Sequence, residues 1–504
     1  MSILNTFIVY IMRSRQKRIN KFMNNPIDSQ EKTLKHLVKS AAKTEFGIQH
    51  YFHNIKTYTD FKKNIPVKTY EDLFPWIDRN LIGEQNLLWP TKINWFAKSS
   101  GTTNDKSKYI PVSREALFHC HYRAGKDILS FYCNEFPNAK IFTGRSLTLG
   151  GSHEINPLDK GSYIGDLSAI LIDNLPYWVR RMRSPKKEIA FLGKWEEKID
   201  KMAEETIHQN ITSISGVPSW TMVFFNKVLE KSGKKNIEEV WPNLEMYMHG
   251  GIKLQPFQVQ MNAFFPSKKL KCIEIYNASE GFFGIQPQSD IHEFLLMLDY
   301  GIFYEFIPSE EFDAKEPKTI SLAEVELNKT YAVVISTNAG LWRYQLGDTI
   351  KFTSTNPYRF VIEGRTKQFI NVFGEELMVS NADKAIEIAA QKCNLNVTEY
   401  TVAPVFFDGK KSGAHEWIIE FETIPTDLTK FNYCLDNALK SLNSDYETKR
   451  YQNLILREPQ IIAIKKGTFY EWLKSKNKLG GQNKIPRLSN DRIWFEQIKA
   501  FVEK

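Results

Sequence analysis

The chain has 504 residues, of which 42% are hydrophobic and 25% are charged, so it is a globular protein long enough for two or three domains. Its 67 basic and 58 acidic residues are interspersed and give a net charge of +9, without the long basic stripe that binds nucleic acid. The five cysteines are scattered and form no Cys-x-x-Cys pair, which argues against a disulfide framework or a zinc ribbon and favours a cytoplasmic setting.

The N-terminal stretch of residues 3–12 is apolar, and its basic residues (Arg13, Arg15, Lys17 and Arg18) come after it. It is too short to cross a membrane, and no small-residue cleavage site follows it. We therefore expect a helix that docks on the rest of the protein and no integral membrane association. Weak contact with a membrane surface is the alternative.

Hydroxyls, a glycine and lysines gather in one short loop, at Ser99, Ser100, Gly101, Thr102 and Thr103, followed by Lys106 and Lys108. Hydroxyls donate hydrogen bonds, glycine lets the backbone approach an anion, and lysines offset its charge, so the loop suits a polyphosphate. Residues 93–97 and 109–112 read as flanking strands. The loop is not a P-loop, because Asp105 replaces the second glycine and no helix follows directly. A polar surface hairpin is the alternative.

Helices and strands alternate through the next part of the chain. Ser113 can cap a helix that extends to about residue 134, and residues 194–209 form an amphipathic helix. Strands are expected at residues 211–215, 271–276, 294–298, 331–336 and 358–362. We therefore predict an α/β fold with a large multi-sheet N-terminal domain.

The pattern changes to a compact α+β alternation after Lys367. Helices are expected at residues 382–392 and 428–442 and from 469 onward, and strands at 400–406, 417–421 and 460–464. This predicts a large domain of residues 1–366 and a small C-terminal domain of residues 367–504.

Two segments offer a surface for a flat ligand. Gly250 and Gly251 follow an aromatic stretch and would let such a ligand lie against bare backbone, unless they form a plain turn. Tyr276, Ser279 and Glu280 end a strand and supply a stacking face, a hydroxyl and an oxygen ligand for Mg²⁺. A solvated strand end is the alternative for this second segment.

Two later segments could bind a sugar and a phosphate. Gly347 permits a tight turn, after which the carboxylate of Asp348 could accept hydrogen bonds from both hydroxyls of a ribose. Arg365 and Lys367 end a strand at the expected domain boundary and could reach sugar or phosphate.

In order and spacing, these five segments resemble the core motifs of the adenylate-forming superfamily of acyl and aryl ligases. The loop lacks the Gly-x-Pro-Lys ending that is usual in acyl-CoA ligases. The segments Tyr-Asn-Ala-Ser-Glu at residues 276–280 and Trp-Arg-Tyr-Gln-Leu-Gly-Asp at residues 342–348 are similar to the Gretchen Hagen family of auxin-responsive acyl-acid amido synthetases and their bacterial relatives. The similarity covers nearly the whole chain.

The resemblance implies that a carboxylic acid is activated by ATP as an acyl-adenylate and that an amine, such as an amino acid, then receives the acyl group. It implies that residues 99–103 hold phosphates, Tyr276 stacks near adenine, Ser279 and Glu280 bind phosphate and Mg²⁺, Asp348 binds ribose, and Arg365 binds sugar or phosphate. Lys484, in a Gly-Gly-Gln-Asn-Lys-Ile-Pro-Arg loop, would enter the active site when the small domain closes.

Several alternatives stay open at this point. Lys484 could be a surface lysine, and Val217 and Trp220, expected from the resemblance to line the acyl pocket, could be ordinary core residues. The acceptor could be the thiol of CoA or of a carrier protein. The chain could also bind nucleotide without catalysis, although its motif residues argue against this. The oligomeric state is not indicated.

Overall fold

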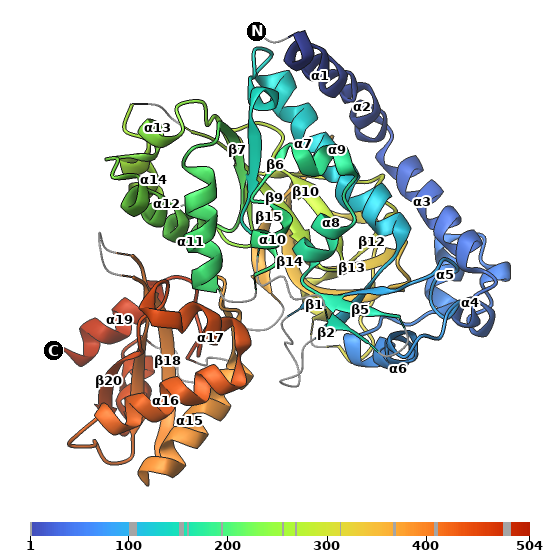
Figure 1. Cartoon of the computed structure of the whole chain (residues 1–504). Coiled ribbons are helices and arrows are strands. Elements are labelled where there is room, and N and C mark those ends of the chain that lie inside the picture. Colours follow the sequence, from blue (N-terminus) through green and yellow to red (C-terminus); the bar gives the residue numbers. More distant parts are fainter. Residues whose placement is uncertain are drawn as a thin grey trace.

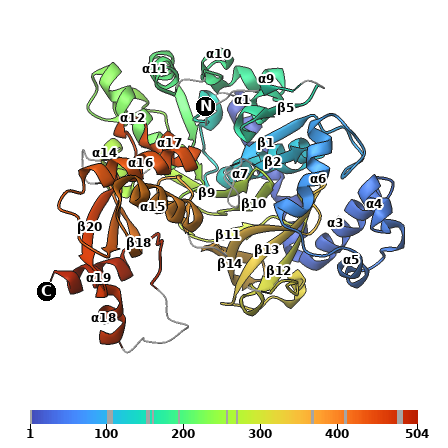
Figure 2. The same ribbon diagram turned by 90° about the horizontal axis from the view of Figure 1, so that it is seen from below.

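The computed structural model describes residues 3–99, 108–150, 156–158, 161–192, 195–254, 257–267, 270–312, 314–365, 369–407, 412–476 and 485–503. It shows an α/β protein with a large N-terminal part and a smaller C-terminal part, which confirms the expected fold class (Figure 1). Figure 2 shows the same two parts from below.

Six α-helices and the short helix η1 (Phe52–Asn54) precede the first strand and lie on the outside of the large part (Figure 1). The α-helices are α1 (Ile3–Ser14), α2 (Gln16–Asn24), α3 (Pro26–Ala41), α4 (Glu45–Gln49), α5 (Tyr58–Asn64) and α6 (Tyr70–Leu81). Helices α5 and α6 begin with capping boxes, in which Thr57 and Thr69 exchange hydrogen bonds with Asp60 and Asp72. The helix expected at residues 3–12 is therefore confirmed as α1.

An 11-stranded sheet forms the centre of the large part. Its strands, in spatial order, are β12 (Ile302–Pro308), β13 (Thr330–Thr337), β14 (Tyr344–Thr355), β15 (Tyr358–Arg365), β11 (Phe294–Leu296), β10 (Gly281–Ile285), β9 (Lys271–Ala278), β8 (Met246–Gly250), β7 (Ile211–Ser215), β3 (Arg145–Thr148) and β6 (Arg183–Ser184). Strands β9, β8, β7, β3 and β6 are parallel, whereas the pairs from β9 to β12 are antiparallel. The carboxyl ends of β7, β8 and β9 therefore meet at one edge of the sheet.

A smaller sheet carries the hydroxyl-rich loop. Its order is β2 (Lys108–Val112), β1 (Trp95–Ser99), β5 (Tyr163–Gly165) and β4 (Asn156–Pro157). Strands β1 and β2 are antiparallel, with Ser99 opposite Lys108, so the two strands expected beside the loop are confirmed. Ser113 then caps the next helix by accepting a hydrogen bond from the amide of Ala116 at 2.9 Å, as expected.

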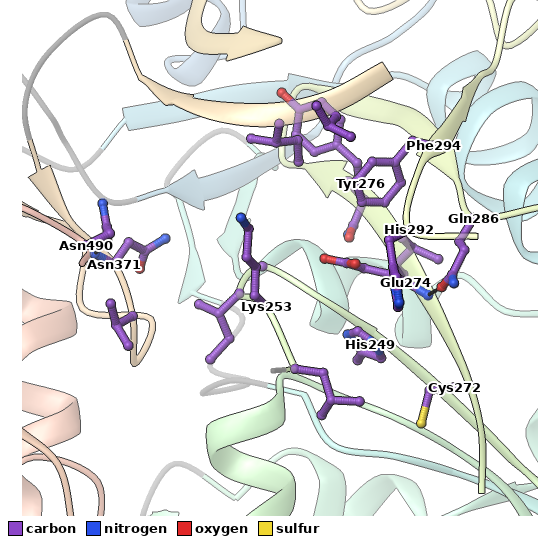
Figure 3. A pocket seen from close by; sticks show the side chains of 18 of the residues that line it. His249, Lys253, Cys272, Glu274, Tyr276, Gln286, His292, Phe294, Asn371 and Asn490 are labelled. Carbon is purple, nitrogen blue, oxygen red and sulfur yellow. Dashed lines mark hydrogen bonds between the residues drawn. The ribbon is translucent and has the colours of Figure 1, made fainter. Parts of the chain in front are cut away.

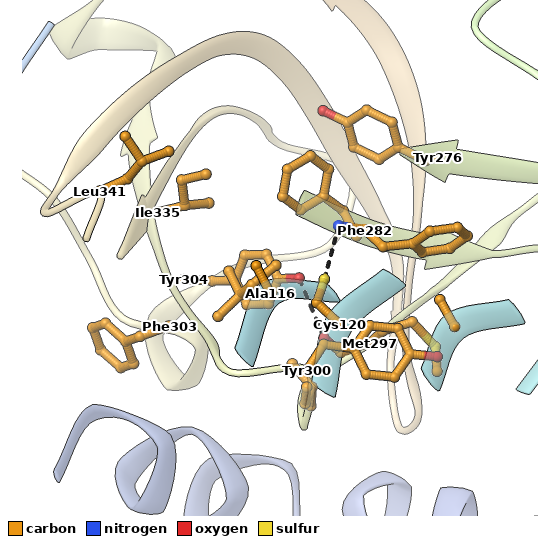
Figure 4. Close-up of a cluster of buried hydrophobic side chains, with 14 of the residues drawn as sticks. Ala116, Cys120, Tyr276, Phe282, Met297, Tyr300, Phe303, Tyr304, Ile335 and Leu341 are labelled. Atoms are coloured by element: carbon orange, nitrogen blue, oxygen red, sulfur yellow. Dashed lines mark hydrogen bonds between the residues drawn. The ribbon is translucent and has the colours of Figure 1, made fainter. Parts of the chain in front are cut away.

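Helices follow the strands in the large part. They are η2 (Ala116–His121), α7 (Tyr122–Glu135), α8 (Leu167–Asp173), α9 (Tyr177–Arg181), α10 (Lys187–Ala190), α11 (Trp195–Thr206), α12 (Pro218–Ser232), α13 (Ile237–Val240) and α14 (Gln258–Phe264). The apolar side of η2 packs on the antiparallel half of the large sheet, where the amide of Phe282 donates to Cys120 Sγ at 3.2 Å (Figure 4). This core supports β9 and β10, which carry Tyr276 to Glu280.

The C-terminal part alternates as the sequence predicts. It contains β16 (Phe369–Ile370), β17 (Leu377–Met378), α15 (Val379–Cys393), β18 (Val397–Val405), β19 (Ala414–Phe421), α16 (Thr429–Leu442), α17 (Ser444–Arg450), β20 (Gln460–Lys465), α18 (Thr468–Ser475) and α19 (Ile493–Val502). Strands β18, β19 and β20 form one sheet. The domain boundary expected at Lys367 falls outside the described residues and stays a prediction.

The two parts contact each other through α12. The hydroxyl of Ser219 donates to the carbonyl of Phe373 at 3.1 Å, and both residues are buried. The ammonium of Lys449 lies 4.3 Å from the ring centroid of Trp220. One apolar cluster extends from α12 into the C-terminal part, so the two parts share buried surface in this structure.

Candidate active site

A cavity of about 2180 Å³ lies beside the ends of β8 and β9 and is lined on its other side by residues of the C-terminal part. Among the residues expected to bind ligand, six line it: Ser99, Gly251, Tyr276, Ser279, Glu280 and Asp348. Asn371 and Asn490 lie across the cavity from Tyr276 and Glu274, with Lys253 between the two sides (Figure 3). Six segments that are distant in the sequence thus contribute to one space.

Tyr276 and Asp348 are joined directly. The phenol of Tyr276 donates a hydrogen bond to Asp348 Oδ2 at 2.6 Å, although the residues are 72 positions apart. The ring of Tyr276 packs against Phe283, with the centroids 5.0 Å apart. Gly347 has φ +91° and lies inside β14, where the register with β13 shifts, so the tight turn expected here is wrong and Asp348 instead follows a bulge within the strand. The aromatic face and the carboxylate therefore have fixed relative positions.

A second chain of hydrogen bonds connects the end of the hydroxyl-rich loop to Glu280. Lys108 Nζ donates to the phenol oxygen of Tyr344 at 3.4 Å, and that phenol donates to Glu280 Oε1 at 3.3 Å. Burial raises the pKa of Tyr344, so its hydroxyl keeps the proton. Sequence reasoning assigned Lys108 only the general role of offsetting anionic charge, and it assigned no role to Tyr344, although Tyr344 stands inside a motif that it quoted.

Gly250 ends β8 and Gly251 follows it, and each position requires a glycine for a different reason. A Cβ at Gly250 would lie 2.5 Å from the carbonyl oxygen of Ile275 on β9, so the adjacent strands approach too closely for a side chain. Gly251 has φ +82° and lines the cavity. The bare backbone at Gly251 agrees with what the sequence suggested. The close approach of β9 to Gly250 could not be predicted from the sequence.

The cavity wall also holds two titratable groups that sequence reasoning missed. Glu274 and His249 are register partners on β9 and β8, and both line the cavity. Burial raises the pKa of Glu274 to about 7 and lowers the pKa of His249 to about 3. His249 Nδ1 is buried and has no hydrogen-bond partner among the described residues. The imidazole of His249 is therefore neutral. Side chains alternate between the two faces of a strand, so the sequence of β9 already predicts that Glu274 lies on the same face as Tyr276.

The residues expected at the acyl pocket do not line this cavity. Val217 precedes α12, with its Cγ2 3.7 Å from the position of a Cβ on Gly251. Trp220 is buried on α12 beneath Lys449. Their roles stay predictions.

Several other expected residues are not placed. Ser100, Gly101, Thr102, Thr103, Lys367 and Lys484 lie outside the described residues. Arg365 is the last residue of β15, opposite Asp348 in the strand register. The segment directly after Lys484 is fixed on β18, because Thr401 Oγ1 donates to the carbonyl of Pro486 at 2.6 Å and the amide of Val402 donates to the carbonyl of Arg487 at 2.9 Å.

Two solved structures share the fold of this chain. The GH3.15 acyl acid amido synthetase has a TM-score of 0.59 at 17% identity, with 97% of this chain and 95% of that chain covered. The 2-hydroxyisobutyryl-CoA ligase in complex with 2-HIB-AMP and CoA has a TM-score of 0.56 at 13% identity, with 95% and 92% covered. The fold is that of the adenylate-forming ligases.

The chain belongs to the GH3 family. The model of the GH3 family N-terminal domain matches residues 15–270, the central domain matches 295–365, and the C-terminal domain matches 380–493. Similar relatives include the indole-3-acetic acid-amido synthetase GH3.4 of Arabidopsis thaliana, 23% identical with 94% of this chain and 90% of the relative covered. The jasmonoyl–L-amino acid synthetase JAR4 of Nicotiana attenuata is also 23% identical, with 91% and 90% covered. The resemblance stated from the motifs is confirmed.

Proposed function

We propose that the chain is an ATP-dependent acyl-acid amido synthetase. It converts a carboxylic acid to an acyl-adenylate and transfers the acyl group to an amine, such as an amino acid. Family membership supports the proposal, since relatives that match nearly the whole chain are named as an indole-3-acetic acid-amido synthetase and a jasmonoyl–L-amino acid synthetase. The observation that carries it is the joining of Tyr276 to Asp348 and of Tyr344 to Glu280 along one cavity.

The geometry suits a bound nucleotide. With the base against Tyr276 and the Gly250–Gly251 backbone, the Asp348 carboxylate is placed for ribose hydroxyls. Lys108 and Glu280 then lie toward the phosphates, beside the loop that begins after Ser99. The acid oxygen attacks the α-phosphorus, and pyrophosphate leaves. The amine nitrogen next attacks the acyl carbon, and AMP leaves. Positioned cations stabilise the charge that develops on phosphate oxygens.

The donor set fits Mg²⁺ in part. The described residues contain no group of three or more His, Cys, Asp or Glu side chains placed to hold a metal. Mg²⁺, however, is usually held by one or two carboxylates together with substrate phosphates, and Glu280 lines the cavity. We propose that Glu280 holds Mg²⁺, which would neutralise phosphate charge. The other residues act by binding and orienting the nucleotide.

We also propose a boundary at residues 366 and 367 and rotation of the small domain between the half-reactions. Strand β15 ends at Arg365 and β16 begins at Phe369 in a separate sheet, which supports a hinge in this stretch. Lys484 would stabilise the adenylation step, supported by the anchored segment that follows it.

A cytoplasmic setting agrees with the absence of any disulfide among the five cysteines, all of which lie in the described ranges.

The acceptor is tested by product analysis of the full chain. Carboxylic acids are screened for pyrophosphate release with ATP and Mg²⁺, and each active acid is then offered amino acids or CoA. The proposal expects an amide and AMP with an amino acid. A thioester as the main product would instead assign a CoA ligase, whose fold is shared. ATP binding without acid-dependent pyrophosphate release would indicate a non-catalytic nucleotide-binding protein.

A further inference from the structure

The outer side of α1 is apolar and exposed. Its large side chains and their exposed fractions are Ile3 88%, Leu4 61%, Phe7 60%, Tyr10 71% and Ile11 40%. Spacings of three and four residues place them along one side of the helix. Figure 1 shows α1 at an outer edge of the molecule. Five exposed large apolar side chains on one 12-residue helix form a contiguous patch rather than scattered exceptions.

The inner side of α1 is held firmly to the body of the protein. Asn5 Nδ2 donates to the carbonyl of Ala139 at 2.9 Å, and Val9 is buried. Just after the helix, Arg15 forms an ion pair with the buried carboxylate of Asp127 at 2.5 Å. The exposed apolar side therefore belongs to a docked helix whose orientation is fixed.

Basic side chains continue the same side toward α2. Arg13, Lys17 and Lys21 are exposed and are spaced by four residues, so they follow the line of Phe7 and Tyr10 along the helix. None of the three forms an ion pair with a described residue, whereas Arg15 and Arg18 are paired with aspartates of the body. Residues 1–24 contain five basic residues and no acidic residue. This side of the two helices is thus apolar along α1 and positively charged from Arg13 to Lys21, and residues 1–24 contain no acidic side chain to neutralise that charge.

We propose that this stripe, formed by Ile3, Leu4, Phe7, Tyr10 and Ile11 with Arg13, Lys17 and Lys21, docks the protein peripherally on an anionic lipid surface. The apolar side chains would enter the boundary between head groups and acyl chains, and the three cations would bind lipid phosphates. No helix in the described ranges is long and apolar enough to cross a membrane, so the contact is with one surface. A convex stripe one helix wide matches a lipid surface without needing a shaped groove. The inference is independent of the proposed reaction.

Sedimentation with vesicles tests the proposal on the full chain. One vesicle set is phosphatidylcholine alone, and the other contains about one part in four of phosphatidylglycerol. Wild type should bind the anionic vesicles, and Phe7→Glu should lower the vesicle partition coefficient about tenfold or more. Replacing Arg13, Lys17 and Lys21 together by Gln should remove the preference for anionic lipid. Added salt should weaken the binding of wild type, because salt screens the charges.

Tyr433→Glu provides the matched control, because Tyr433 is an aromatic residue on α16 that is 70% exposed and far from α1 in the sequence. It should bind vesicles as wild type does. Phe7→Glu should keep the melting temperature and pyrophosphate release of wild type, which shows that it folds. The proposal is overturned if wild type does not bind the anionic vesicles, or if Phe7→Glu and wild type bind equally. It is also overturned if light scattering shows a dimer that Phe7→Glu abolishes, since the stripe would then bind a second copy.

Discussion

The proposed role of Asp348 in binding the ribose can be tested directly. Its carboxylate lines the cavity and already accepts a hydrogen bond from Tyr276. We expect Asp348→Ala to weaken ATP binding by about 1.5–3 kcal/mol, the range for hydrogen bonds to a charged group. Calorimetric titration with ATP measures this. Tyr276→Phe is the matched control, because it keeps the ring, removes the phenol and should cost only about 1 kcal/mol. Unchanged affinity in Asp348→Ala would contradict the ribose assignment.

Glu274 should give the protein a measurable pH dependence. Burial raises its pKa from 4.5 to about 7, so the folded state binds this proton more tightly than the unfolded state. Its contribution to stability is complete below pH 4.5 and is lost as the pH rises through about 7. Between about pH 4 and pH 8, the free energy of unfolding of wild type should fall relative to Glu274→Gln by on the order of 3 kcal/mol. Urea titrations check this, and parallel pH profiles would refute it.

At the scale of elements, the close approach of β8 and β9 can be tested at Gly250. A methyl group there would meet the carbonyl oxygen of Ile275 at 2.5 Å, so the strands must separate. We expect Gly250→Ala to lower the free energy of unfolding by about 1–3 kcal/mol, as overpacking does, and to weaken ATP binding. Gly347→Ala is the comparison, since a Cβ there meets no atom within 4 Å and only the positive φ is strained. Thermal unfolding that ranks Gly347→Ala as the more damaging would contradict the packing argument.

The helices and strands expected from sequence are found near their expected ranges, because their patterns are local. Strand β7 matches its expected range of residues 211–215, and α16 differs from its expected range by one residue. What the sequence could not provide is which distant residues meet. The hydrogen bonds from Lys108 to Tyr344 and from Tyr344 to Glu280 span 236 and 64 positions, and they depend on how the sheets pack. The raised pKa of Glu274 also depends on burial in a wall that forms only in the fold.

At the scale of the whole molecule, Lys449 makes the contact between the two parts sensitive to pH. Burial lowers its pKa from 10.5 to about 8, against the opposing effect of Asp445, Glu375 and Glu376. Its ammonium lies over Trp220 of the large part, so separation of the parts would expose both groups to water. The charged form is the one that burial disfavours. The docked arrangement should therefore gain stability as the pH rises through about 8 toward 10.5.

Small-angle scattering at about pH 7 and pH 9 checks this expectation. Wild type should be more compact at the higher pH, because the neutral amine is buried at lower cost. Lys449→Met keeps an unbranched apolar stem and should be equally compact at both values. If wild type and Lys449→Met respond identically to pH, Lys449 does not control the contact.

The central claim is that this chain forms an acyl-adenylate before any acceptor is involved. The most direct measurement is acid-dependent exchange of isotopically labelled pyrophosphate into ATP, without an amine, by wild type, Lys484→Ala and Lys478→Ala. Lys478 is another lysine in the same C-terminal segment and serves as the control. We predict exchange by wild type and Lys478→Ala and a large loss in Lys484→Ala, with amide formation from preformed acyl-adenylate much less affected. No exchange by wild type with any acid, in the presence of Mg²⁺, would contradict it.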